Sequence, residues 1–257
     1  MGSTDIDRET TTQSDVYKQE YKPSFVEKWD ELIGWDGRAE GEGGFFEKLL
    51  REHGCERVLD AATGTGYHAV NLAQAGFDVV AADGAETMLA KTEENMREYG
   101  VQFPTYVADW RELDEQVPGK FDALLCLGNA FTHLYADDDR LQAMQQFYEI
   151  LEPGGLAIID QRNYDMFLER GFQSKHQYYY VGEGVNAFPE EISEEVVRFR
   201  YEFPDGAVHH LSLFPIRTED LSAHMRSSGF TELKRYGDFE PDYDPLDADF
   251  IIHIGHK

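Results

Sequence analysis

The chain has 257 residues, which is long enough to bury a full hydrophobic core as one large α/β domain or as a domain with an insertion. It carries 50 Asp and Glu residues against 23 Lys and Arg residues, a formal net charge of −27 at pH 7. A field of this sign repels phosphate backbones and anionic lipid headgroups, so we expect no nucleic-acid partner and no membrane partner. The balance favours a soluble acidic protein, and more specifically one whose dense surface carboxylates prevent association in concentrated salt.

The apolar periodicity predicts an N-terminal tail followed by an α/β domain. Residues 1–16 are polar, acidic and poor in large apolar side chains, so we expect a flexible tail. Aromatic residues recur at near-helical spacing over 17–29, and 42–53 has the apolar stripe of a helix. Strand-like and helical segments then alternate, which predicts a doubly wound, Rossmann-like parallel sheet over 17–177. The expected strands are 57–62, 77–83, 104–109, 121–128 and 154–160, and the expected helices include 66–76 and 85–99.

The pattern changes after residue 177. Strand-like runs at 178–182, 194–203 and 209–216, with the turn sequence "PDG" at 204–206, predict an antiparallel hairpin. We expect 178–216 to form a small antiparallel β insertion over the carboxyl ends of the parallel strands, where open α/β sheets bind ligands. A helix at 218–228 and strands at 233–239 and 249–256 then return the chain to the α/β core over 217–257.

The cysteines and the apolar runs indicate a cytoplasmic location. Cys55 and Cys126 are the only two cysteines and have no metal-type spacing, so we expect both to be core thiols in a reducing compartment. The sequence has no run of about 18 apolar residues, and its N-terminus has no basic-then-apolar signal pattern. These features predict a cytoplasmic protein without a metal site.

The stretch "VLDAATGTGYHAV" at 58–70 runs from a buried strand into a glycine-rich turn and then into a helix. Gly64 and Gly66 let the backbone turn tightly and approach a ligand at the helix N-terminus. "GTGYHA" fits the G-x-G-x-x-A form of a dinucleotide fingerprint, and Asp83, at the end of the next strand, suits a ribose diol. Nicotinamide-dependent enzymes share both features, so these residues alone leave the ligand open.

Further acidic residues at the strand ends discriminate between the ligands. Asp60 lies four residues before the first glycine, where a carboxylate opposes a pyrophosphate but favours a cationic, phosphate-free ligand. "ADW" at 108–110 places Asp109 beside the flat Trp110, an acceptor for an adenine amine next to an apolar wall for its ring. Each acid alone fits ordinary capping or turn chemistry. Three acids at three successive strand ends predict an adenosyl sulfonium, namely S-adenosylmethionine.

Several stretches resemble the glycine N-methyltransferase family, namely "RVLDAATGTGYHAVNLAQAGFDVVAAD", "FDALLCLGNAFTHL", "EPGGLAIIDQRNYD" and "GDFEPDY". That family includes the glycine/sarcosine methyltransferases that begin betaine synthesis in salt-tolerant microbes. The resemblance implies a class I methyltransferase that converts glycine to sarcosine and sarcosine to dimethylglycine, releasing S-adenosylhomocysteine. Arg38 would pair with the methionyl carboxylate, Asp83 would hold the ribose, and Asp109 with Trp110 would hold the adenine. By matching position, the full set of implied cofactor contacts is Tyr21, Trp29, Arg38, Ala62, Asp83, Asp109, Trp110 and Leu127.

Arg162 follows the predicted strand 154–160 at its ligand-facing end, where a guanidinium fork can hold a small carboxylate. From spacing alone, a salt bridge with Asp160 or Asp165 explains this arginine equally well. The resemblance implies that Arg162 binds the carboxylate of the methyl acceptor, and that Asn129 and Tyr201 also line the acceptor site.

The resemblance adds further candidates on the acceptor side. Tyr243, in "EPDY", matches a family tyrosine over the site, and Tyr180 is the favoured pocket residue of "YYY", with Tyr179 as the alternative. His133 lies four residues beyond Asn129 and is a catalytic candidate, although a lone histidine is more often structural. Leu32 stands where the mammalian members have a tyrosine, which leaves the preference among glycine, sarcosine and dimethylglycine open.

Other functions stay open on the sequence alone. A nicotinamide-dependent oxidoreductase would use "GTGYHA" but leaves Asp60 and "ADW" unexplained, and a protein that only senses S-adenosylmethionine leaves Arg162 unexplained. Within the enzyme class, the alternatives are a sarcosine/dimethylglycine methyltransferase and a glycine-only enzyme that controls the S-adenosylmethionine pool. The expected partner is a small amino-acid substrate, and the sequence does not distinguish a monomer from a homo-oligomer.

Overall fold

The computed structural model describes residues 15–174 and 181–257, and within them the main sheet has seven strands. Their order across the sheet is β3–β2–β1–β4–β5–β10–β9. The strands are β1 (Arg57–Asp60), β2 (Asp78–Asp83), β3 (Thr105–Val107), β4 (Phe121–Cys126), β5 (Leu151–Arg162), β9 (Thr231–Gly237) and β10 (Phe250–His256). The first five in the order pair in parallel, whereas β10 pairs antiparallel with both β5 and β9. The doubly wound sheet expected from the sequence is thus present, with an antiparallel edge.

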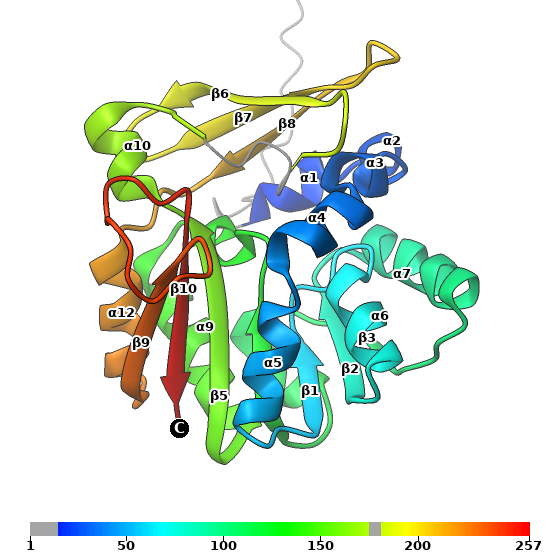
Figure 1. Cartoon of the computed structure of the whole chain (residues 1–257), viewed down its shortest axis with the longest axis vertical. Helices are drawn as coiled ribbons and strands as arrows, with labels where there is room; N and C mark the ends of the chain where they lie inside the picture. The colour runs from blue at the N-terminus through cyan, green and yellow to red at the C-terminus, as the bar shows by residue number, and fades with distance from the viewer. Residues whose placement is uncertain (1–14, 175–180) are drawn as a thin grey trace, which may run out of the picture.

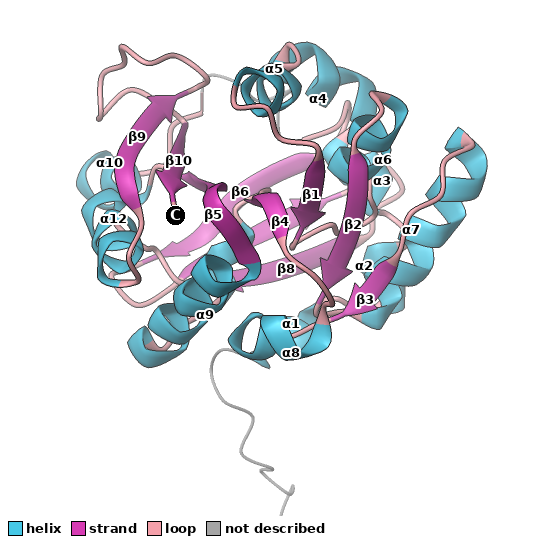
Figure 2. Ribbon diagram, turned by 90° about the horizontal axis from the view of Figure 1, so that it is seen from below, coloured by secondary structure: helices cyan, strands magenta, loops and turns pink. Residues whose placement is uncertain are grey.

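Helices cover both faces of this sheet (Figure 2). The α-helices are α1 (Tyr17–Glu20), α2 (Pro23–Val26), α3 (Trp29–Ile33), α4 (Trp35–Glu42), α5 (Phe45–Glu52), α6 (Tyr67–Gln74), α7 (Glu86–Tyr99), α8 (Leu113–Gln116), α9 (Asp137–Ile150), α10 (Tyr164–Arg170) and α12 (Thr218–Ser227). Helices α5 and α6 lie on one face of the sheet, and α9 and α12 lie on the other (Figure 2). Two short 3-10 helices, η2 (Trp110–Glu112) and η3 (Ala130–His133), follow strand ends within the described residues.

The central strands of the sheet, namely β1, β2, β4, β5 and β10, are buried on both faces over most of their length, whereas the edge strands β3 and β9 are partly exposed. Leu59 and Val80 join the apolar cluster beneath α9, while their neighbours Val58 and Val79 join the cluster beneath α5 and α6. Because successive side chains of a strand point to opposite faces, a strand covered on both sides needs an unbroken apolar run. This double burial explains why the strands read as continuous apolar segments in the sequence.

A small antiparallel sheet lies over the carboxyl ends of the parallel strands (Figure 1). It consists of β6 (Asn186–Ile192), β7 (Val197–Glu202) and β8 (Val208–Leu213), in that order. The turn at 204–206 joins β7 to β8, as the "PDG" sequence predicted. The insertion predicted over 178–216 thus includes a sheet at 186–213 that roofs the ligand-facing edge.

The structure differs from the sequence-based prediction at three elements. No strand forms at Val181 and Gly182, the described end of the run expected at 178–182, and β6 occupies a range that the sequence analysis left unassigned. β6 contains Pro189 at a register shift, and prolines within sheets are confined largely to edge strands and bulges of this kind. The helix expected over 42–53 begins later, as α5 at Phe45, because Gly43 and Gly44 adopt positive φ and end the preceding helix α4 at Glu42.

The N-terminal aromatic segment folds as short helices rather than one, since α1 ends at Glu20 and Pro23 begins α2 after two intervening residues. Most of the tail expected over 1–16 lies outside the described residues. None of the helices in the described part of the chain combines the length and apolar character needed to span a bilayer.

Candidate active site

The glycine turn between β1 and α6 is fixed by contacts to the next strand and helix. Gly64 and Gly66 have φ values of +56° and +95°, which glycine adopts without steric cost. The Gly64 N–H donates to Asp83 Oδ2 at 2.9 Å, and the Thr92 hydroxyl donates to the Gly64 carbonyl at 2.8 Å. The turn therefore presents its backbone in one conformation at the ligand-facing edge.

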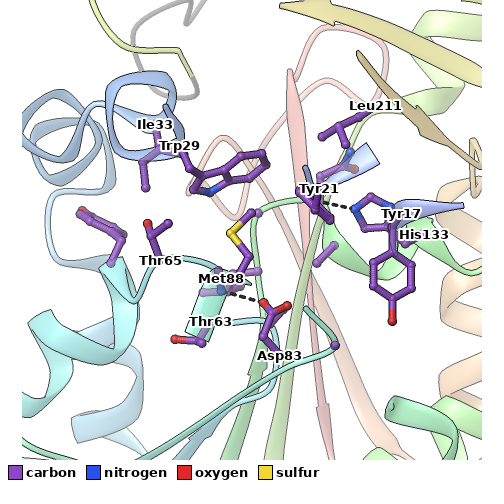
Figure 3. A pocket seen from close by; sticks show the side chains of 18 of the residues that line it. Tyr17, Tyr21, Trp29, Ile33, Thr63, Thr65, Asp83, Met88, His133 and Leu211 are labelled. Carbon is purple, nitrogen blue, oxygen red and sulfur yellow. Dashed lines mark hydrogen bonds between the residues drawn. The ribbon is translucent and has the colours of Figure 1, made fainter. Parts of the chain in front are cut away.

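A cavity of about 1300 Å³, including the solvent at its mouth, lies above this turn and beneath the small sheet. Figure 3 shows its side chains converging from α1, α3, the strand ends and β8. The sequence-predicted residues that line it are Tyr21, Trp29, Arg38, Ala62, Gly64, Asp83, Asp109, Trp110, Leu127, Asn129, His133, Arg162 and Tyr201. One cavity thus collects both the cofactor and the acceptor candidates.

Not every candidate lines the cavity. Asp60, at the end of β1, is only 1% exposed and does not line the cavity, and Gly66 faces Thr92 rather than the cavity. Tyr243 lies in the loop between β9 and β10. Its side chain packs against the backbone of Gly237 in β9, and it does not line the cavity. Tyr180 and its alternative Tyr179 lie outside the described residues.

Asp83 is the carboxylate that the turn and α7 hold in place. Its Oδ1 accepts the Ala85 N–H at 2.9 Å, and its Oδ2 accepts the Gly64 N–H. These two bonds favour the ionised carboxylate, but the larger effect of burial raises the pKa of Asp83 to about 7. Burial also raises the pKa of Asp60 above its ordinary value. Asp83, which lines the cavity, therefore titrates near neutral pH.

The wall after β3 is rigid. Trp110 Nε1 donates to the Ala61 carbonyl at 2.6 Å, and the indole stacks 6.2 Å from the ring of Phe131. Asp109 is held by Arg111, whose Nη2 lies 2.6 Å from Asp109 Oδ2 and whose Nε lies 2.9 Å from Oδ1. The guanidinium holds the pKa of Asp109 below its ordinary value, so this acceptor stays ionised at the cavity wall.

Arg38 belongs to a buried charged group on the α4 side of the cavity. Its Nε donates to Glu42 Oε1 at 2.8 Å, and His68 Nε2 lies 2.9 Å from the same oxygen. These partners outweigh burial and lower the pKa of Glu42 to about 2. The Arg38 guanidinium therefore enters the cavity from a fixed, ionised pair.

Asn129 connects the ends of β4 and β5. It has a left-handed backbone, with φ of +64°, and its N–H donates to Asp160 Oδ1 at 2.8 Å. Its side-chain Oδ1 accepts the Arg162 N–H at 2.9 Å, and its Nδ2 donates to the Tyr164 hydroxyl at 2.8 Å. The Asn129 amide thus holds the segment that carries Arg162 in place. This structural role was not predicted from the sequence.

The side chain of Arg162 is buried, 8% exposed, and lies over the rings of Phe199 and Phe250. Asp165, considered above as a salt-bridge partner, pairs with Arg217 at 3.1 Å. Tyr201, on β7, is also buried and lies on the same side of the cavity roof.

His133 ends η3 and bonds to an N-terminal aromatic residue. Its Nε2 lies 2.8 Å from the Tyr21 hydroxyl (Figure 3). Burial lowers the pKa of His133 to about 4, so the imidazole is neutral at physiological pH. Glu20, next to Tyr21 in the chain, accepts hydrogen bonds from the N–H and the hydroxyl of Ser212 in β8, both at 2.8 Å. This contact holds the Tyr21–His133 pair beneath β8, at one side of the cavity.

Several lining residues were not predicted from the sequence, among them Tyr17, Ile33, Met88, Arg111, Leu211 and Leu213. Arg111 directly follows "ADW", so its position after an acid at a strand end was an available signal. Tyr17 and Met88 reach the cavity only through tertiary packing. In the described part of the chain, no group of three or more His, Cys, Asp or Glu side chains is arranged to hold a metal ion.

The lining fits an adenosyl sulfonium better than a dinucleotide. Arg38 and Arg111 are each paired with a carboxylate, and the Asp83 carboxylate lies beside the glycine turn, where it would repel a pyrophosphate. Met88 and Trp110 supply apolar surface for a flat ring. The fold and this site define a class I S-adenosylmethionine-dependent methyltransferase.

Comparisons with known proteins agree. The family described as "Methyltransferase domain" matches residues 58–155. A solved S-adenosylmethionine-dependent methyltransferase from Clostridium acetobutylicum shares the fold, with a TM-score of 0.70 and 19% identity over 91% of this chain and 97% of that one. Glycine/sarcosine N-methyltransferases from Aphanothece halophytica and Halorhodospira halochloris are each 48% identical over 95% of this chain, and over 92% and 91% of their own lengths. The chain belongs to the glycine/sarcosine N-methyltransferase family.

Proposed function

We propose that this enzyme methylates the amine of glycine to give sarcosine and that of sarcosine to give dimethylglycine. The observation that carries the proposal is Arg162, a buried guanidinium at the end of β5 in the same cavity as the glycine turn. The kinship with named glycine/sarcosine N-methyltransferases supports this choice of acceptor. We further propose that the reaction serves betaine synthesis in the cytoplasm, in keeping with the acidic composition.

The proposed roles divide the cavity into a donor side and an acceptor side. On the donor side Asp83 accepts the ribose hydroxyls, Asp109 and Trp110 hold the adenine, and Arg38 binds the methionyl carboxylate. The paired guanidinium of Arg38 and the ionised state of Asp109 support these roles. The remaining proposed donor-side contacts are Tyr21, Trp29, Ala62, Gly64 and Leu127, while Asp60 and Gly66 act from outside the cavity lining.

On the acceptor side, Arg162 binds the substrate carboxylate and Tyr201 orients the amine. Asn129 acts mainly by bracing the Arg162 backbone, because its amide already bonds to Arg162 and Tyr164. His133 stays neutral and contributes a polar edge rather than a charge. For Tyr180 and Tyr243 we retain only the family correspondence, since the first is outside the described residues and the second packs on Gly237.

The proposed chemistry is an in-line displacement at a methyl carbon. When bound, S-adenosylmethionine supplies a sulfonium methyl group, so the C–N bond forms as the C–S bond breaks and S-adenosylhomocysteine leaves. The amine attacks through its lone pair, so the acceptor ammonium first loses a proton to solvent. The chain's contribution is to align the two reactants, and such positioning is worth roughly 7–11 kcal/mol when well arranged.

Replacement of Arg162 by Lys tests the acceptor site. Lysine keeps the charge but loses the planar fork, so we expect the KM for glycine to rise about 10- to 100-fold while the KM for S-adenosylmethionine is unchanged. Steady-state kinetics with each substrate varied would measure both constants. An unchanged glycine KM would remove Arg162 from the acceptor site.

An acceptor panel of glycine, sarcosine and dimethylglycine, with products identified by mass, tests the substrate assignment. We expect methylation of glycine and sarcosine. Activity on dimethylglycine with none on glycine would favour the alternative sarcosine/dimethylglycine enzyme, and activity on glycine alone would favour a regulator of the S-adenosylmethionine pool. Leu32, which lines the cavity, is the first position to exchange if the preference differs from the expected one.

A further inference from the structure

The guanidinium of Arg162 lies against two phenylalanine rings that come from different sheets. Its Cζ is 4.8 Å from the ring centroid of Phe199 and 4.9 Å from that of Phe250. Phe250 is the cross-strand partner of Arg162 in the β5–β10 pair, whereas Phe199 belongs to β7 of the small sheet. Both rings are buried, with Phe250 2% exposed and Phe199 0% exposed. The cation thus sits at the junction of the main sheet and the roof.

The two ring contacts restrain the plane of the guanidinium. A cation over a ring face is attracted by the ring quadrupole, and the attraction is stronger where water is excluded. Asn129 holds the other end of the same residue by accepting the Arg162 backbone N–H. Two-point fixation of this kind sets the direction of the fork, on which bidentate binding of a carboxylate depends.

The ring on the roof side is itself held firmly. Phe199 lies 6.2 Å from the rings of Tyr201 and Phe167, so it belongs to an aromatic cluster that continues into α10. Tyr201 lines the cavity beside Arg162. A shift of β7 would therefore move the ring that orients the cation together with the tyrosine of the acceptor side.

We propose that Phe199 and Phe250 are positioning residues for the methyl acceptor, which hold the Arg162 guanidinium in the orientation that binds the substrate carboxylate. This inference rests on the proposed function, in which Arg162 makes that contact. Phe250 belongs to the main sheet and Phe199 to the small sheet. The affinity for the amino acid should therefore depend on how the small sheet packs on the main sheet.

Fluorinated phenylalanines test the proposal without changing the shape of the core. Phenylalanine carrying one, two or three ring fluorines would be incorporated singly at position 199 or 250, which progressively weakens the negative ring face. We expect the glycine KM to rise with each fluorine, by about threefold to tenfold for the trifluorinated ring, while kcat and the KM for S-adenosylmethionine stay constant. Incorporation of ordinary phenylalanine by the same route should restore the parent KM.

Phe230 provides the matched control. It is similarly buried, at 3% exposure, but its ring packs on Tyr148 and does not line the cavity. The same fluorinated series at this position should leave both KM values unchanged.

The Arg162→Lys variant separates failure of this inference from failure of the proposed function. A glycine KM that rises in Arg162→Lys but is flat across both fluorinated series would overturn the positioning role and leave the acceptor site standing. A glycine KM that is unchanged in Arg162→Lys would overturn both. A rise of equal size in the Phe230 series would show a general loss of packing and would also overturn the positioning role.

Discussion

Asp83 combines a structural and a binding role at one carboxylate. Two backbone N–H groups, from Gly64 and Ala85, hold it at the end of β2. Burial nevertheless raises the pKa of Asp83 to about 7 in the ligand-free protein. Ribose hydroxyls donate hydrogen bonds, so they favour the ionised carboxylate and lower this pKa on binding. Binding of the adenosyl ligand below neutral pH must therefore release a proton.

We predict that the affinity for S-adenosylhomocysteine falls as the pH drops below about 7, by up to about tenfold per pH unit. The sign follows because Asp83 of the ligand-free protein is protonated below its pKa, and the ligand must displace that proton. Calorimetric titration between pH 5 and 8.5, in buffers of different ionisation enthalpy, measures both the Kd and the proton release. Asp83→Asn should bind more weakly and flatten the profile, whereas a flat profile in the parent protein would contradict the assignment.

His133 cannot serve as the base that titrates near neutrality, because burial lowers its pKa to about 4. We therefore expect kcat/KM for glycine, at saturating S-adenosylmethionine, to rise about tenfold per unit from neutral toward alkaline pH through the substrate ammonium alone. His133→Gln should keep this slope even if the absolute rate falls. The prediction fails if the variant loses the slope or if the parent profile is flat.

The acids of the site could be predicted from the sequence because the carboxyl ends of parallel strands meet at one edge of a sheet. Asp83 and Asp109 each follow a recognisable strand, and both line the cavity. Tyr17 could not be found in this way, since it does not follow a strand of the sheet. It lies in the N-terminal helix α1 and reaches the cavity only because α1 packs against β8. The role of Asn129 in holding the Arg162 backbone could not be predicted either, because it depends on how β4 and β5 are paired.

At the scale of elements, the turn between β1 and α6 depends on the absence of a side chain at Gly66. A Cβ there would lie 2.9 Å from Thr92 Cγ2, in addition to the strain of φ at +95°. Thr92 is fully buried and its hydroxyl donates to the Gly64 carbonyl, so it cannot move aside without breaking the bond that fixes the turn. The glycine is thus required by both its backbone and its neighbour.

We predict that Gly66→Ala lowers the free energy of unfolding by about 1–3 kcal/mol, measured by urea denaturation. Gly76→Ala is the matched control. Gly76 has φ of +92°, but a Cβ at this position would meet no atom of the described residues within 4 Å. The Gly76→Ala variant should therefore lose only the stability that backbone strain costs. Thr92→Ser removes Cγ2 and keeps the hydroxyl, so combining it with Gly66→Ala should recover the difference between the two glycine variants. Equal losses at both glycines would show that the Thr92 contact has no effect.

The elements themselves could be predicted where the apolar period was clear and only partly elsewhere. The buried strands β1, β2 and β4 read directly as apolar runs because helices cover both of their faces. β6 was missed because it is an exposed edge strand whose sequence, with a proline and two adjacent glutamates, has no regular apolar alternation. Its position is set by pairing with β7, a long-range contact that local sequence does not encode.

At the scale of the whole molecule, the net charge of −27 opposes the compact state through self-repulsion. Screening shortens the range of this repulsion from about 10 Å at 0.1 M salt to about 3 Å at 1 M. Ion pairs such as Arg51–Glu47 are exposed and contribute little in return. Because the repulsive charges far outnumber the pairs, added salt should stabilise the protein rather than weaken it.

We predict that raising KCl from 0.05 M to 1 M increases the Tm by on the order of 5 °C, measured by calorimetry. A charge variant separates screening from a general salt effect, because Glu52, Glu93 and Glu152 are exposed and lie outside the cavity. Changing all three to Gln brings the net charge from −27 to −24. This variant should melt higher than the parent in 0.05 M KCl and gain less from added salt, since it has less repulsion to screen. If parent and variant gained equally, salt would be acting on apolar hydration and not on the acidic surface.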